Sequence, residues 1–168
     1  RNLPHWQRGG ATYFVTFRVQ SGTLSPDERT IVLDACKHWD GKKAEVFAVV
    51  VMHDHVHVLL TPWETSPGSG QWHPLAELLH SIKSFSAHAI NKLRGTTGAV
   101  WQDESFDRLV RRDEEFNEKV TYMCENPVKA GLASHWDQYP WTYMPEETRR
   151  GQRRYTRDGE EQDRGGVE

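Results

Sequence analysis

The segment Met52–Leu60, with the sequence MHDHVHVLL, holds the densest group of side chains that could carry out chemistry. Valines alternate with histidines, which is typical of a strand, so His55 and His57 share one face, about 6.5–7 Å apart along the strand. Val56 points to the opposite face, toward a core. Two imidazoles on one face can bind a single divalent metal ion, which also polarises a phosphate oxygen. Two structural histidines on a partly exposed sheet are the alternative, and the spacing leaves both open.

A second candidate group is Tyr122 and Asn126, which are four residues apart. On a helix they share one face, about 6 Å apart along the axis. Taken alone, such a tyrosine is usually an aromatic at the edge of the core, and Asn126-Pro127 is a helix stop. Beside a metal held by His55 and His57, Tyr122 becomes a candidate covalent nucleophile and the Asn126 amide oxygen a candidate ligand.

Periodicity and turn signals predict the elements that must position these residues. The order strand, helix, strand, strand, helix, strand, helix favours an α+β, ferredoxin-like split βαβ fold with a central antiparallel sheet and an added C-terminal catalytic helix. The strand that carries the histidines then lies in the middle of the sheet. The predicted strands are 11–19, 45–52, 55–61 and 105–110, and the helices follow Ser25, span Pro74–Leu93 and run from Asp113 to Asn126-Pro127.

Length and composition predict one domain, residues 1–148, followed by a charged, disordered tail over 149–168. No segment approaches the roughly 18 apolar residues of a membrane span. The two cysteines, Cys36 and Cys124, are too few for a disulfide framework or a cysteine-rich zinc site. We therefore expect a protein of the reducing cytoplasm.

The formal net charge of -3 at first argues against a nucleic-acid-binding protein, because such domains usually carry a basic excess. The charge is unevenly distributed, however. Residues 1–112 hold 13 basic and 11 acidic side chains, whereas residues 113–148 hold 2 and 8. One acidic segment thus conceals a mildly basic body, and the charge does not exclude DNA.

Several further segments resemble the REP-associated tyrosine transposases, a branch of the single-tyrosine HUH (IS200-like) transposases. The resemblance covers about residues 1–143, and it is specific because HVHVLL occurs together with a downstream tyrosine and the sequence NPVKAGL. Asp54 departs from the pattern, since relatives commonly have asparagine there. The matching segments are Arg1–Gln7, Tyr13–Arg18, His55–Leu60, Leu78–Asn91, Val100–Asp107, Tyr122–Leu132 and Tyr139–Trp141.

The resemblance implies a metal-dependent enzyme that cleaves and rejoins single-stranded DNA. His55 and His57 would bind Mg²⁺ or Mn²⁺, with Asn126 as a third ligand. Tyr122 would attack the scissile phosphate, leaving a 5′-phosphotyrosine and a free 3′-hydroxyl, so that strands rejoin without ATP.

The partners implied are single-stranded DNA hairpins formed by repetitive extragenic palindromes, bound by a monomer or homodimer in the bacterial cytoplasm, at the nucleoid. Binding such DNA needs cations for phosphates and flat side chains for unpaired bases. The N-terminal arm is the favoured element for reading the single-stranded foot of the hairpin. The candidate DNA-binding residues are Arg1, His5, Trp6, Arg8, Lys83, Lys92, Arg94, Arg108, Arg111 and Arg112.

Two other functions stay open at this point. His53, His55 and His57 alternate as in histidine-triad nucleotide hydrolases, which need no metal, although Asp54 and the segment around Tyr122 fit that pattern poorly. A domesticated, noncatalytic hairpin-binding protein would keep the fold without the chemistry.

The tail over residues 149–168 could reach DNA with its basic half or block the DNA groove with its acidic half.

Overall fold

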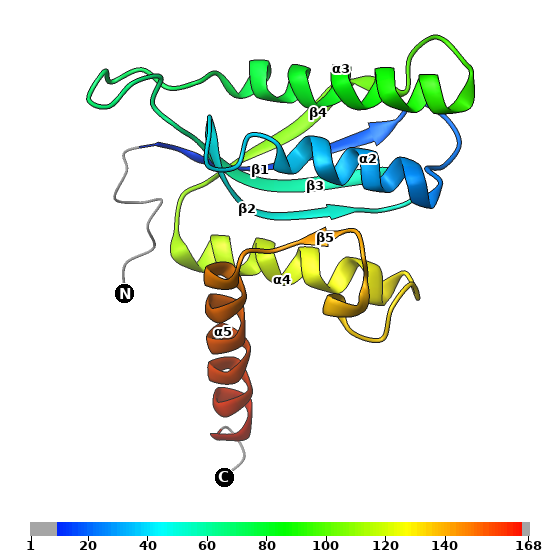
Figure 1. Cartoon of the computed structure of the whole chain (residues 1–168). Coiled ribbons are helices and arrows are strands. Elements are labelled where there is room, and N and C mark those ends of the chain that lie inside the picture. Colours follow the sequence, from blue (N-terminus) through cyan, green and yellow to red (C-terminus); the bar gives the residue numbers. More distant parts are fainter. Residues whose placement is uncertain (1–9, 166–168) are drawn as a thin grey trace.

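The computed structural model describes residues 10–165 and forms a sheet with helices on both faces (Figure 1). Each helix boundary follows from a local signal. Ser25 caps α2 in a capping box with Glu28, for example, and Gly95 ends α3 in the left-handed conformation. In chain order the elements are β1 (Thr12–Val19), α2 (Pro26–Lys37), β2 (Ala44–Val51), β3 (His55–Pro62), α3 (Leu75–Arg94), β4 (Trp101–Val110), α4 (Asp113–Lys129), the 3₁₀ helix η1 (Trp136–Gln138), β5 (Thr142–Tyr143) and α5 (Glu146–Gly165).

The five strands pair antiparallel in the order β4-β1-β3-β2-β5. The first four follow the ferredoxin-like order, so the predicted α+β fold with its central antiparallel sheet is confirmed. Strand β3 lies in the middle of the sheet, as predicted for the strand that carries the histidines. Helices α2 and α3 cover one face, and α4 covers the other (Figure 1).

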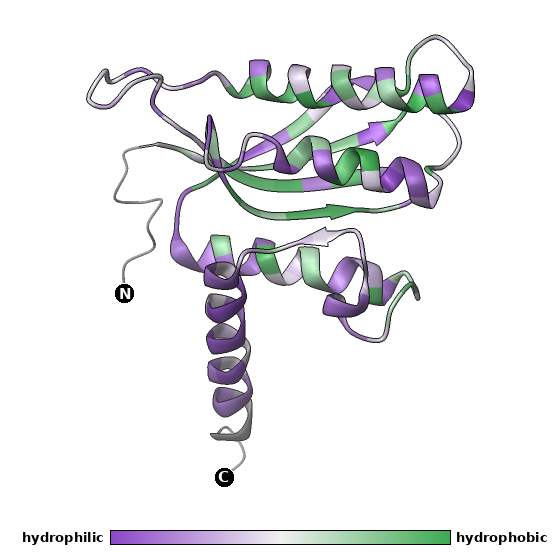
Figure 2. Cartoon of the chain, viewed as in Figure 1, coloured by the Kyte–Doolittle hydropathy of each residue, from purple (hydrophilic) through white to green (hydrophobic). Residues whose placement is uncertain are grey.

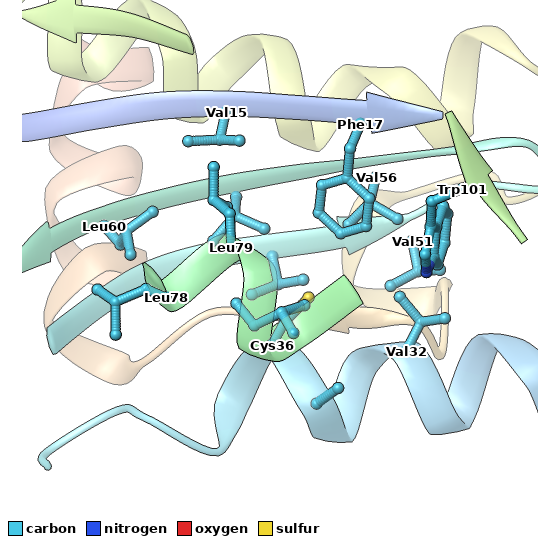
Figure 3. Close-up of a cluster of buried hydrophobic side chains, with 14 of the residues drawn as sticks. Val15, Phe17, Val32, Cys36, Val51, Val56, Leu60, Leu78, Leu79 and Trp101 are labelled. Carbon is cyan, nitrogen blue, oxygen red and sulfur yellow. The ribbon is translucent and has the colours of Figure 1, made fainter. Parts of the chain in front are cut away.

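The face of the sheet under α2 and α3 holds the larger core (Figure 3). Alternate side chains of the strands, such as Val15, Phe17 and Val56, point into it because successive residues of a strand face opposite sides. Cys36 is buried there as a free thiol, and Cys124 is free and buried on the other face. Neither cysteine forms a disulfide.

The second core lies between the sheet and α4. Phe14 and Leu59 from the strands meet Phe116, Val120 and Met123 from the helix. These three helical positions are three to seven residues apart, so they form one apolar stripe along α4. Burial of this stripe fixes α4 on the sheet and determines which of its side chains remain accessible.

Several boundaries differ from the predictions. Helix α4 continues through Pro127 to Lys129 because the missing Pro127 N–H removes only one bond, and Ala130 N–H still donates to the Asn126 carbonyl. Strand β4 begins at Trp101 rather than at residue 105, and β5 was not predicted.

The predicted disordered tail is a helix in the structure. Helix α5 begins at Glu146, so the predicted domain boundary at residue 148 falls within its first turn. Its strongly hydrophilic sequence (Figure 2) suggested disorder, but Arg150 and Arg153 pair with Glu146 on its surface, and Gln152 bonds to Thr121 of α4.

Among the described residues, no helix has the length and apolar character needed to cross a membrane.

Candidate active site

The two histidines of β3 lie on the face of the sheet that α4 covers. His57 is paired with Thr16 of β1 on one side and Val50 of β2 on the other, while His55 is opposite Arg18. The two rings are 4.9 Å apart between centroids, so the predicted convergence of the histidines is present. His57 is buried, with 3% of its surface exposed, and stacks on Phe14 at 5.1 Å.

His57 is held through one nitrogen and leaves the other without a partner. Its Nδ1 lies 2.7 Å from the Thr16 hydroxyl, and its Nε2 is buried without a hydrogen bond to any described residue. Burial, reinforced by the electrostatic effect of His55, Arg18 and Lys119, lowers the pKa of His57 to about 3. The ring is therefore neutral at physiological pH. In the tautomer whose Nδ1–H donates to Thr16, the lone pair is on Nε2.

His55 is oriented in a similar way. Its Nδ1 lies 2.7 Å from a carboxylate oxygen of Asp54, and this hydrogen bond holds the pKa of Asp54 below its usual range. A histidine whose Nδ1 is fixed by an oxygen presents Nε2 to a metal, and a carboxylate partner also makes the imidazole a stronger ligand. The departure from the family pattern at Asp54 thus acts on His55, because this carboxylate fixes the orientation of the ring.

Helix α4 brings Tyr122 beside these rings. The Tyr122 ring lies 5.3 Å from His57 and 6.0 Å from Phe14 between centroids, in edge-on contacts. The next residue, Met123, is buried in the core. Tyr122 lies at the edge of the buried face of α4 and is 49% exposed. The phenol is therefore both next to the histidines and accessible to a large substrate.

Asn126 lies one turn beyond Tyr122 on α4 and is half-buried. Residues 10–165 contain no cluster of three or more His, Cys, Asp or Glu side chains that could hold a metal. The candidate ligand set is of another kind, two imidazoles and one amide. The unpartnered, buried Nε2 of His57 fits such a ligand, because buried polar atoms normally have a partner.

Two cations near the histidines were missed by the sequence analysis. Arg18 is exposed on β1 opposite His55, and the Lys119 ammonium lies 4.9 Å above the Phe14 ring. The sequence did contain signals that place both cations near the site. Arg18 shares the strand face of Thr16, and Lys119 precedes Tyr122 by three helical positions. They make the surroundings of the site basic despite the acidic start of α4.

Comparison by sequence and comparison by structure both find REP-associated tyrosine transposases. The chain is 22% identical over 145 residues to a protein of Haemophilus influenzae, and 23% identical over 146 residues to one of Escherichia coli K12, both named as REP-associated tyrosine transposases. These matches span 79% and 84% of this chain, and 79% and 81% of the relatives. No family model matches the sequence.

A solved structure of a REP-associated tyrosine transposase bound to a REP hairpin has the same fold. It aligns with a TM-score of 0.64 and 22% identity, over 79% of this chain and 76% of that one. This chain resembles the REP-associated tyrosine transposases. The expected resemblance is therefore confirmed in sequence and in fold.

On the basis of the resemblance to transposases, several positions were predicted to contact DNA. These positions lie on two faces of the molecule. Lys83, Lys92 and Arg94 belong to α3, on the face opposite the histidines. Lys83 lines a cavity of about 790 Å³ between α3 and β4 and donates to the carbonyl oxygens of Gln102 and Asp103, and burial lowers its pKa. Arg94 is paired with Glu28 of α2.

The remaining predicted cations among the described residues lie where β4 meets α4. Arg108 of β4 pairs with Glu115 of α4 at 2.7 Å, and Arg111 and Arg112 are exposed between β4 and α4. The structure thus brings Tyr122, His55 and His57 together and separates the α3 cations from them. Predicted positions Arg1, His5, Trp6 and Arg8 lie outside the described residues.

Proposed function

We propose that this chain is a transposase that acts on DNA hairpins of the REP type, cleaving and rejoining a single strand through Tyr122. One observation carries this proposal. A neutral, buried histidine with a free Nε2 lies in ring contact with a half-exposed tyrosine, on a fold shared with a REP-hairpin-bound transposase. The curated relatives, which are transposases by name, support an enzyme that acts on DNA.

The residues that would hold the metal are His55, His57 and Asn126. Bound there, Mg²⁺ or Mn²⁺ would supply charge stabilisation to a phosphate oxygen. Thr16 and Asp54 fix the two imidazoles so that each offers Nε2. Because burial keeps His57 neutral, no proton has to leave that ring before it can act as a ligand.

Tyr122 would carry the covalent chemistry. Its phenol oxygen attacks phosphorus in line and loses its proton to solvent, while the bond from phosphorus to the 3′ oxygen breaks. The products are a 5′-phosphotyrosine and a free 3′-hydroxyl. One phosphodiester is exchanged for another, so attack by a 3′-hydroxyl reverses the step and rejoins strands without ATP.

The proposal predicts a covalent protein–DNA adduct that needs Tyr122 and His57. We expect the wild-type protein to form it with single-stranded hairpins from the flanks of its own gene in Mn²⁺, scored on denaturing gels. Tyr122→Phe should abolish the adduct because the nucleophilic oxygen is gone. His57→Ala should abolish metal-dependent cleavage.

Tyr155→Phe is the matched control, since it removes a partly exposed hydroxyl from α5 and should leave the adduct unchanged. Adduct formation by the Tyr122→Phe protein would show that another residue is the nucleophile. Cleavage that persists in a chelator would instead favour the histidine-triad alternative. Hairpin binding without cleavage, under all these conditions, would favour the noncatalytic alternative.

A further inference from the structure

The register of β4 places Phe106 on the face of the sheet that carries the candidate active site. Phe106 is directly opposite Thr16, which is in turn opposite His57. Residues paired in an antiparallel sheet point to the same side, so the three form a row across β4, β1 and β3. The neighbours agree with this orientation, because Arg108 reaches Glu115 of α4, whereas Asp107 lines the cavity beneath α3.

Phe106 is exposed in a way that the fold does not require. Its exposed fraction is 65%, and within residues 10–165 its ring makes no aromatic or cation contact. The next aromatic on this face, Phe14, is by contrast 5% exposed and lies beneath His57 and Tyr122. A single exposed apolar ring is ordinary on a protein surface. Phe106 is set apart by its place in one row with Thr16 and His57.

The surroundings of Phe106 define the chemistry of that partner. Neighbouring strands are about 4.8 Å apart, so the backbone of Phe106 is about 10 Å from that of His57. Arg18 and Lys119 supply positive charge at the His57 end of the row. A flat apolar ring on a face that also carries cations matches single-stranded nucleic acid, whose bases stack on aromatics while its phosphates meet the cations.

We propose that Phe106 is a stacking platform for an unpaired base adjacent to the scissile phosphate. This inference rests on the proposed function, and it assigns Phe106 a positioning role. A stacked base would fix the strand beside the phosphate that Tyr122 attacks, since Tyr122 contacts both Phe14 of β1 and His57 of β3. Stacking tolerates any base, so Phe106 would set the position of the strand more than its sequence.

The test uses hairpins in which 2-aminopurine replaces one unpaired base at a time, because stacking on an aromatic ring quenches its fluorescence. Binding is measured in a Tyr122→Phe background, so that no cleavage interferes. At one position next to the scissile phosphate we expect quenching that is lost in Phe106→Ala and restored in Phe106→Trp. Phe106→Ala should also weaken hairpin binding about 5- to 100-fold.

Phe85→Ala is the matched control, since Phe85 is 64% exposed but belongs to α3, on the other face. It should change neither quenching nor affinity. An abasic nucleotide at the quenched position should cause the same loss as Phe106→Ala, and the two together should cause no further loss. Equal effects of the two alanine variants, or additive effects of Phe106→Ala and the abasic nucleotide, would overturn the inference.

The outcome is separable from that of the proposed function. Suppose that the wild-type protein forms the adduct and that Phe106→Ala binds and quenches normally. This result would contradict only the stacking role of Phe106 and would leave the proposed function intact. Absence of any adduct in Mn²⁺ would contradict the proposed function, while quenching by Phe106 would still be measurable by binding. Circular dichroism of Phe106→Ala and Phe106→Trp would verify that both are folded.

Discussion

The chemistry available to His57 depends on a single hydroxyl. Thr16 lies 2.7 Å from Nδ1, and it is the only hydrogen-bond partner that residues 10–165 give to the ring. If Nδ1–H donates to this oxygen, Nε2 has the free lone pair. Thr16 would therefore act as a positioning residue for the ligand.

Thr16→Val should weaken Mn²⁺ binding because it removes that partner while keeping the shape of the side chain. We expect the Mn²⁺ concentration for half-maximal cleavage to rise about 10- to 100-fold, the usual effect of losing such a partner. Saturating Mn²⁺ should restore most of the rate, and Thr16→Ser should resemble the wild type.

Thr12→Val is the control for that substitution. Thr12 is buried on the same strand and bonds to Thr61 at 2.7 Å, away from the histidines. It should lower the free energy of unfolding without changing the metal titration. The role of Thr16 would be refuted if both variants shifted the titration equally.

At the scale of the elements, an ion pair between Arg94 and Glu28 ties α3 to α2. Burial alone would raise the pKa of Glu28, but hydrogen bonds from Arg94 and from Ser25 outweigh it and hold the pKa below 4.5. A depressed carboxyl pKa means that this pair stabilises the fold above pH 4.5 and loses its effect as the pH falls below that value.

Arg94→Met should therefore lower the free energy of unfolding at pH 7 by about 1–3 kcal/mol, because it leaves a buried carboxylate without its partner. The difference from the wild type should shrink when urea unfolding is repeated between pH 4.5 and 2. Arg150→Met, at an exposed pair on α5, should change the unfolding free energy little. A pH-independent difference for Arg94→Met would mean that packing, not charge, explains the loss.

The element scale also shows what could be predicted from the sequence. Alternating valines and histidines in residues 55–60 were sufficient to predict the strand and the shared face of its two histidines. Its central place was predicted from the order of the elements. Tyr122 was predicted to lie beside the histidines only through the family resemblance, because no local pattern specifies the packing of α4 on the sheet. The exposure of Phe106 depends on strand register, which sequence periodicity does not provide.

Helix ends and the tail were harder to predict for a physical reason. A proline removes one hydrogen bond, so whether α4 stops at Pro127 depends on the next turn, where Gly131 adopts a left-handed conformation. The composition of residues 149–168 indicates disorder, but contact between Gln152 and Thr121 fixes the start of α5. Such tertiary contacts are not visible in composition.

At the scale of the whole molecule, a net charge of -3 predicts weak overall attraction to DNA. Affinity must then come from local cations, and their positions on two faces of the sheet allow them to be tested separately. Lys119→Gln on the active-site face should lower the slope of log affinity against log salt by about 0.7–0.9, the effect of one phosphate contact.

Lys92→Gln on α3 removes the same charge from the opposite face. An equal fall in the slope for this variant would show that DNA also reaches α3, as the sequence predicted for Lys92. An unchanged slope for Lys119→Gln would contradict a phosphate contact beside Tyr122. Fluorescence anisotropy with a labelled hairpin at several salt concentrations measures both.

The most direct test of the central claim is to locate the covalent bond. The wild-type protein is incubated with Mn²⁺ and a single-stranded hairpin from its own flanks, the adduct is digested with nuclease and protease, and the peptides are analysed by tandem mass spectrometry. We predict a nucleotide attached through its 5′ phosphate to the peptide that contains Tyr122, on the phenol oxygen. Attachment to any other residue, or cleavage without attachment, would contradict the claim.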